Sequence, residues 1–115
     1  MIRRGEIYYI ENDRKRGRMT KGNRPAVVVS NDKANCFSDC VEVVYLTTAK
    51  KKPLPTHVRI FSAQRRSTAL CEEVDTVAVE QLGRYCGRLS ARELLQMDEA
   101  LLNSLGIGGR CGWKE

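Results

Sequence analysis

The sequence predicts a small, mainly β domain of the α+β class with one helix near its C-terminal end. Short β-rich runs recur between polar or proline-marked turns. The connectors between them are too short to hold the crossover helices that a parallel sheet requires. A helical apolar period appears only after residue 88. We therefore expect antiparallel strands in a small sandwich or barrel.

Six runs rich in β-branched, aromatic or other apolar residues are expected to form the strands. They lie at residues 5–10 (GEIYYI), 25–30 (PAVVVS), 41–46 (VEVVYL), 57–61 (HVRIF), 67–71 (STALC) and 76–79 (TVAV). The polar segment NDKANCFSD, which precedes the third run, is expected to be a turn.

A helix is expected at about residues 90–105. Its apolar residues follow one helical stripe or flank it: Leu94, Leu95, Met97, Leu101, Leu102 and Leu105. Ser90 and Glu93 have the spacing of a capping box, and Gly106 is a natural C-terminal stop. The glycine-rich segment 107–115 is expected to be a mobile tail.

Length and composition indicate one domain over residues 1–115. The chain has 115 residues, of which 42% are hydrophobic and 30% charged, so it can form one hydrophobic core. Twenty lysines and arginines against fourteen acidic residues give a net charge of +6 and a pI near 9.3. This excess favours a polyanionic partner such as nucleic acid.

The basic residues gather in two expected connectors, at residues 12–24 and 47–57. The first contains Arg14, Lys15, Arg16, Arg18, Lys21 and Arg24, and the second contains Lys50, Lys51 and Lys52. Charged runs are commonly just solvated surface. Connectors held by a rigid β scaffold are nevertheless typical places for binding residues, and the first is far longer than an ordinary hairpin loop.

Several classes of protein are disfavoured. No segment approaches the 18 consecutive apolar residues of a membrane span, and the N-terminus lacks the apolar region of a signal peptide, so we expect a cytoplasmic protein without membrane association. The five cysteines have neither a disulfide nor a zinc-ribbon pattern. Cys36 and Cys40 have a spacing that suits a metal, but partly buried, reduced thiols are the better interpretation. No metal or cofactor is expected.

Four segments in order and spacing give the chain a family resemblance. RGEIYYI, GNRPAVVVSND, VVYLTTAKKKPLPTHVRI and STALCEEVDTV, followed by a closing helix, resemble the MazF/PemK family of toxin endoribonucleases from Gly5 to about Gly106. The resemblance implies an SH3-like barrel with a C-terminal helix and a homodimer. It also implies metal-independent, ribosome-independent, sequence-specific cleavage of single-stranded mRNA, and a cognate antitoxin with an acidic segment.

The resemblance carries catalytic roles to Arg24 and Thr48. Arg24 has a rigid fork of donors for phosphoryl oxygens, and Pro25 fixes the adjoining backbone. Thr47 replaces Thr48 if the alignment shifts by one residue, and strand alternation lets only one of them line the site. We also expect contacts with RNA from Arg16, Arg18, Thr20, Lys21, Asn31, Thr47, Lys50, Lys51 and His57.

Some assignments remain open from the sequence. Arg24 could instead bridge a carboxylate at a strand edge, and His57 could serve structure or a subunit contact. No general base is visible, because the stretch RMTKGNR lacks the Glu or Gln that many relatives carry before this arginine. Two alternative functions are a toxin that binds DNA gyrase without cutting RNA, as in the CcdB family, and an RNA-binding module without cleavage.

Overall fold

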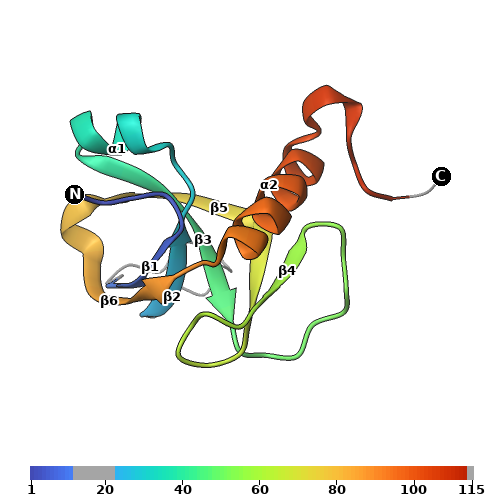
Figure 1. Cartoon of the computed structure of the whole chain (residues 1–115), viewed down its shortest axis with the longest axis horizontal. Helices are drawn as coiled ribbons and strands as arrows, with labels where there is room; N and C mark the ends of the chain where they lie inside the picture. The colour runs from blue at the N-terminus through green and yellow to red at the C-terminus, as the bar shows by residue number, and fades with distance from the viewer. Residues whose placement is uncertain (12–22, 114–115) are drawn as a thin grey trace.

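The structure, a computed structural model, describes residues 1–11 and 23–113. Six strands form one sheet in the order β4-β5-β3-β2-β1-β6, and every neighbouring pair is antiparallel (Figure 1). The strands are β1 (Glu6–Ile10), β2 (Arg24–Val28), β3 (Cys40–Thr47), β4 (His57–Ile60), β5 (Ser67–Ala78) and β6 (Leu82–Arg88). The predicted mainly β, α+β class is confirmed.

The predicted C-terminal helix is also present, as α2 (Ala91–Leu105). Its capping box is formed, since Ser90 N donates to Glu93 Oε1 at 2.9 Å and Glu93 N donates to Ser90 Oγ at 3.1 Å. Gly106 ends the helix in the left-handed region, with φ of 68°. Two short 3-10 helices are also present: η1 (Val79–Gln81) precedes β6, and η2 (Ile107–Gly109) follows α2. Within the described residues, no helix has the length and apolar character to cross a membrane.

Three local predictions were wrong. The segment expected to be a turn contains α1 (Asp32–Phe37), because the Asn31 side chain caps it by accepting a hydrogen bond from Ala34 N at 2.7 Å. The separate strands expected at residues 67–71 and 76–79 form one strand, β5, since the polar residues between them continue the pairing with β3. Strand β6 was not predicted, because its glycines and arginines obscure any alternation.

The apolar stripe of α2 is only partly buried. Met97 and Ala100 are 0% and 3% exposed and face the sheet, whereas Leu95 and Leu105 are 70% and 62% exposed. The predicted apolar stripe is therefore not buried as far as Leu105, and the C-terminal part of α2 extends away from the strands (Figure 1). The exposed leucines leave apolar surface on the helix.

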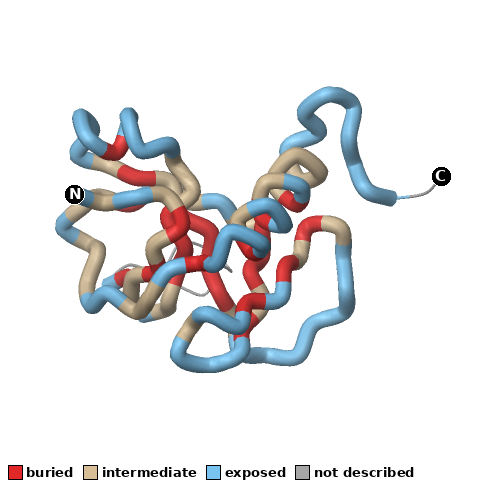
Figure 2. Tube along the Cα trace, viewed as in Figure 1, coloured by how far each residue is buried: buried red, intermediate tan, exposed pale blue. Residues whose placement is uncertain are grey.

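Buried residues lie along the strands and on part of α2 (Figure 2), and they form two clusters on opposite faces of the sheet. One cluster packs between the sheet and α2 and includes Ile7, Val44, Leu46 and Met97. The second lies on the opposite face and consists of Ile10, Ala26, Val28, Val41, Val43, Tyr45 and Val77. Because adjacent strand residues point to opposite faces, the run VEVVYL fills both clusters.

Three bulges interrupt the strand pairing, one in β5 and two in β6. Val44 pairs with Val74 and Leu46 with Ala69, so a step of two residues on β3 faces a step of five on β5. Ile7 pairs with Gly87, Tyr8 with Tyr85 and Ile10 with Leu82, so each of these two steps on β1 faces one extra residue on β6. Bulges redirect side chains and commonly border functional sites. The bulge in β5 contains Glu72 and Glu73, and the bulge in β6 between Leu82 and Tyr85 contains Arg84. Glu73 and Arg84 belong to the site described next.

Candidate active site

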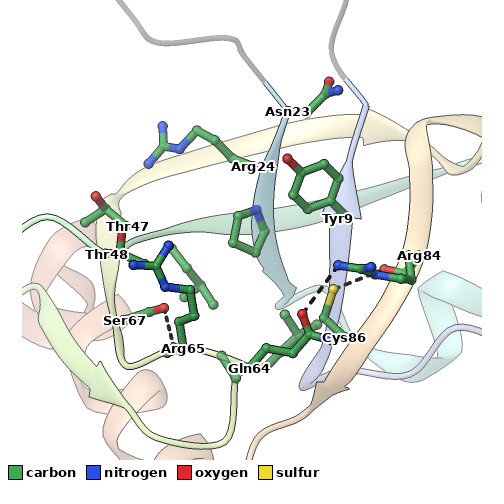
Figure 3. Close-up of a pocket in the computed structure, with 14 residues that line it drawn as sticks. Tyr9, Asn23, Arg24, Thr47, Thr48, Gln64, Arg65, Ser67, Arg84 and Cys86 are labelled. Carbon is green, nitrogen blue, oxygen red and sulfur yellow. Dashed lines mark hydrogen bonds between the residues drawn. The ribbon is translucent and has the colours of Figure 1, made fainter.

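A pocket of about 410 Å³ opens where β1, β2 and β3 meet the β4–β5 turn and β6 (Figure 3). Its polar lining includes two threonine hydroxyls and three guanidinium groups, but no acidic side chain among the described residues. These polar residues are Tyr9, Asn23, Arg24, Thr47, Thr48, Gln64, Arg65, Ser67 and Arg84. A cavity with this composition is suited to an anionic ligand.

Arg24 lies at the rim of this pocket as the first residue of β2. Its guanidinium carbon lies 4.9 Å from the centroid of the Tyr45 ring, and Nη1 lies 3.6 Å from Glu73 Oε1. The Tyr45 hydroxyl in turn donates to Asp75 Oδ2 at 2.7 Å. Aromatic and carboxylate contacts together restrain the guanidinium in a half-buried position. The contact with a strand carboxylate, which the sequence left open, is thus present.

Arg24 begins β2 and Thr47 ends β3. Ala26 pairs with Tyr45, and Arg24 and Thr47 each lie two residues beyond this pair. Because side chains alternate along a strand, Arg24 and Thr47 are expected on the same face of the sheet. The pairing of β2 with β3 begins only after Pro25, which has no N–H to donate. Both side chains therefore lie at the open end of the ladder.

The two threonines differ in environment. Thr47 ends β3, and its Oγ1 accepts a hydrogen bond from Ala49 N at 3.1 Å, which leaves the hydroxyl proton to donate elsewhere. Thr48 lies one residue beyond the strand and is exposed. Both line the pocket (Figure 3), but only Thr47 belongs to β3.

A second, larger groove adjoins the pocket and shares Thr47, Thr48 and Ser67 with it. It has a volume of about 600 Å³ and is lined by the lysines of the β3–β4 connector. Its cationic lining consists of Lys50, Lys51, Lys52, Arg59 and Arg66, together with His57. The two cavities together make a basic surface that continues past the threonines, as a single-stranded polyanion would need.

The His57 ring joins the lysine-rich connector to strand β5 through two polar contacts. Its Nδ1 lies 3.0 Å from the Lys52 carbonyl oxygen, and Nε2 lies 2.9 Å from Glu72 Oε2. Thr56 Oγ1 donates to Glu72 Oε1 at 2.8 Å. Partial burial raises the pKa of Glu72, but the hydrogen bonds from His57 and Thr56 outweigh burial and hold the pKa below its ordinary value. His57 therefore has a structural role in addition to lining the groove.

The predicted site residues are brought together only in part. Arg24, Thr47 and Thr48 line the pocket, and Lys50, Lys51 and His57 line the adjoining groove. Asn31 is the N-cap of α1 and lines neither cavity. The remaining predicted contacts lie outside the described residues: Arg16, Arg18, Thr20 and Lys21.

Sequence reasoning missed the residues that reach the pocket through non-local pairing. Tyr45 reads as a core strand residue, and Glu73 as part of a polar turn between strands. Arg65 and Arg84 stand in segments without a recognisable motif. Glu73 and Arg84 lie in bulges of β5 and β6, and a single sequence does not specify a bulge.

The five cysteines are free thiols. Cys71 is buried between the sheet and α2, and burial raises the pKa of its thiol to about 12. Cys86 lines the pocket, and Cys36 and Cys111 are exposed. Among the described residues, no group of three or more His, Cys, Asp or Glu side chains is arranged to hold a metal ion.

Comparison with known proteins agrees with this fold and site. Residues 3–105 match the family described as PemK-like, MazF-like toxin of type II toxin–antitoxin systems. The chain is 40% identical over 110 residues to the endoribonuclease MazF9 of Mycobacterium tuberculosis, covering 88% of this chain and 93% of the relative. It is 33% identical over 112 residues to the endoribonuclease MazF of Staphylococcus epidermidis, covering 93% of each.

A solved structure gives the same fold. It is an endoribonuclease in complex with its cognate antitoxin from a mycobacterial species, with a TM-score of 0.80 and 25% identity over 99% of this chain and 100% of the other. Sheet, helix and basic pocket thus define a toxin of the type II toxin–antitoxin class. The chain belongs to the PemK-like, MazF-like toxin family and is a MazF-like endoribonuclease. This membership favours cleavage over the gyrase-binding and binding-only alternatives.

Proposed function

We propose that this chain cuts single-stranded mRNA at a specific sequence, without a metal ion and without the ribosome, and that Arg24 and Thr47 carry the reaction. The observation that carries the proposal is that this arginine, which begins β2, and this hydroxyl, which ends β3, both line the cationic pocket. Membership of the toxin endoribonuclease family supports it.

The chemistry that fits these groups is an internal transesterification. The 2′ hydroxyl of the RNA loses its proton to solvent and its oxygen forms a bond to the adjacent phosphorus. The bond from phosphorus to the 5′ oxygen breaks, and the 5′ oxygen takes up a proton, so no net proton is gained or lost. The products are a 2′,3′-cyclic phosphate, or a 3′-phosphate after hydrolysis, and a 5′ hydroxyl. Negative charge builds on the phosphoryl oxygens in the transition state, where a guanidinium fork and a hydroxyl donor stabilise it.

The roles of the two residues follow from their protonation. Arg24 remains charged at neutral pH, so it stabilises the phosphorane and is a poor base. Thr47 donates its hydroxyl proton to a non-bridging oxygen, because its Oγ1 already accepts from Ala49 N. Glu73 and Tyr45 restrain the guanidinium before the substrate arrives, which lowers the entropy lost in reaching the reactive geometry.

The two threonines can be told apart by replacement with valine, which keeps the branched shape and removes the hydroxyl. We expect Thr47→Val to lower the cleavage rate constant by about 10²-fold, as for other single donors to a developing oxyanion, and Thr48→Val to lower it less than about fivefold. Single-turnover cleavage of one RNA measures both. A larger loss in Thr48→Val, with both variants folded, would move the role to Thr48.

The proposed RNA path follows the basic groove from the pocket along the lysine-rich connector. Lys50, Lys51 and His57 line this groove. The proposal also includes RNA contacts from the connector residues expected from the sequence, which are Arg16, Arg18, Thr20 and Lys21. Since mRNA is the proposed substrate, we place the protein in the cytoplasm, as a single toxin domain. We also propose a cognate antitoxin, whose acidic segment competes with RNA for the same groove. A complex with the antitoxin in a structural relative supports that partner.

We also propose that the sheet closes into the SH3-like barrel and that the chain is a homodimer. The two edges of the sheet approach each other near Gly87, where a Cβ atom would lie 3.2 Å from the Ser62 carbonyl oxygen.

The proposed homodimer needs apolar surface for a second copy to cover. Phe61, which follows edge strand β4, and the exposed leucines of α2 supply such surface. Light scattering should give twice the 13.0 kDa chain mass, and a monomer at micromolar concentration would contradict the dimer.

A further inference from the structure

Two arginines of the pocket take no part in the cleavage chemistry derived above. Arg65 belongs to the β4–β5 turn and Arg84 to β6, and both line the pocket whose rim holds Arg24 (Figure 3). Neither forms an ion pair with any residue in the part of the chain that the structure describes. Their charges are therefore not neutralised by the described protein.

The backbone that presents Arg65 is fixed by a buried hydroxyl. Ser67, which is 8% exposed, donates its hydroxyl proton to the Arg65 carbonyl oxygen at 2.8 Å. Glu93 of α2 accepts hydrogen bonds from Phe61 N and Ser62 N at 2.7 and 3.3 Å, which ties the start of the same turn to the helix. The turn is thus anchored on both sides of Arg65.

The bulge in β6 presents Arg84. The extra residue lies between Leu82 and Tyr85, and there Gly83 approaches β1 so closely that a Cβ would lie 2.9 Å from the Tyr9 carbonyl oxygen. Arg84 Nη2 donates to Gln64 Oε1 at 3.4 Å, so the two sides of the pocket meet through this contact. Such a contact holds the guanidinium over the pocket and leaves its remaining donors for a ligand.

We propose that Arg65 and Arg84 form a second phosphate-binding position, which holds the phosphodiester next to the one that is cut. This inference rests on the proposed cleavage of RNA. A nucleic acid strand carries one phosphate per nucleotide, and a guanidinium fork matches two oxygens of each. Because the neighbouring phosphate keeps its charge throughout the reaction, the pair binds substrate and transition state equally and sets the position of the strand.

The test measures binding apart from cleavage. The probe is a fluorescent 2′-O-methyl RNA that spans a mapped cut site, which cannot react because its nucleophile is blocked. Fluorescence anisotropy at several salt concentrations gives the dissociation constant and the slope of log K against log[salt]. The variants are Arg65→Gln and Arg84→Gln. Lys33→Gln is the control of equal charge change, on α1 at the other end of β3 from the pocket.

We expect each arginine variant to weaken binding about tenfold and to reduce the magnitude of the salt slope by about 0.7, the value for one phosphate contact with a single strand. KM should rise with little change in kcat. Arg65→Lys and Arg84→Lys, which keep the charge, should recover the slope and exclude misfolding as the cause. Lys33→Gln should match the wild type.

Two results would overturn the proposal, and they can be distinguished. Slopes in Arg65→Gln and Arg84→Gln equal to that of Lys33→Gln, in a protein that cuts RNA and requires Arg24, would refute the second phosphate position alone. Wild-type protein that cuts no RNA would refute the proposed function together with this inference. A loss of binding to an acidic peptide with unchanged RNA slopes would assign the pair to a protein partner instead.

Discussion

Replacing Arg24 with alanine is expected to lower the single-turnover rate constant for RNA cleavage by at least about 10²- to 10³-fold, the usual cost of removing one preorganised donor from a developing oxyanion. Arg24→Lys should also be strongly impaired, because an ammonium group keeps the charge but cannot span two phosphoryl oxygens. The measurement is cleavage of an end-labelled RNA with enzyme in excess, so that product release does not limit the rate.

Two controls make the Arg24 result interpretable. Arg92→Ala removes an exposed arginine from α2, away from the pocket lining, and should cut RNA at the wild-type rate. Thermal unfolding of Arg24→Ala is needed because the guanidinium packs on the Tyr45 ring, and its loss removes that contact. A folded Arg24→Ala protein with wild-type cleavage would exclude Arg24 from the reaction.

The largest effect on stability is expected at Glu93, a carboxylate that is 6% exposed. It accepts hydrogen bonds from Ser62 Oγ, Phe61 N, Ser62 N and Ser90 N, which join α2 to the β4–β5 turn. Burial raises the pKa of Glu93, but hydrogen bonds from Ser62, Ser90 and Phe61 outweigh burial and lower the pKa to about 2. The ionised form is therefore the one that the folded protein stabilises.

The sign of the pH dependence follows from this lowered pKa. The ordinary value is 4.5, so the contribution of Glu93 to the free energy of unfolding is fully present above about pH 5 and is lost as the pH falls toward 2. A difference of 4.5 minus about 2 corresponds to about 3 kcal/mol. About 2 kcal/mol of it should be gone by pH 3.

Glu93→Gln should lower the free energy of unfolding by about 2–3 kcal/mol at pH 7, because hydrogen bonds to a charged acceptor are replaced by bonds to a neutral one. Urea unfolding at pH 7 and pH 3 measures the effect, and the difference between wild type and variant should shrink at the lower pH. Glu80→Gln, at an exposed position in η1, is the matched control and should change little. An unchanged difference at the two pH values would contradict the assignment.

Local patterns in the sequence predict much of the fold. The capping box at Ser90 and the apolar runs around Val27 and Val44 each span only a few residues, so both signals are visible in the sequence. Strand β6 and the fusion of two runs into β5 depend on what the partner strand offers. The run EEVD reads as a turn by composition, yet its last two residues, Val74 and Asp75, pair with β3 and the strand continues through the bulge.

In the candidate site, too, some residues are visible in the sequence and others depend on pairing between distant strands. Arg24 and the two threonines are visible because they stand at strand ends in recognisable segments. The sequence does not decide between Thr47 and Thr48, because strand alternation needs a known register and both residues stand at the end of β3. Glu73 and Arg84 reach the site through bulges, which arise from the sum of pairing and packing across three strands rather than from any local signal.

In the proposed function this protein cuts single-stranded RNA without any partner. Purified protein should be incubated with a long, defined single-stranded RNA in EDTA, and the cut sites should be mapped by primer extension. We predict cuts at one short recurring sequence, with a 5′ hydroxyl on the downstream fragment, and no cuts with Arg24→Ala. Intact RNA with folded wild-type protein, or the same cuts with Arg24→Ala, would contradict the account.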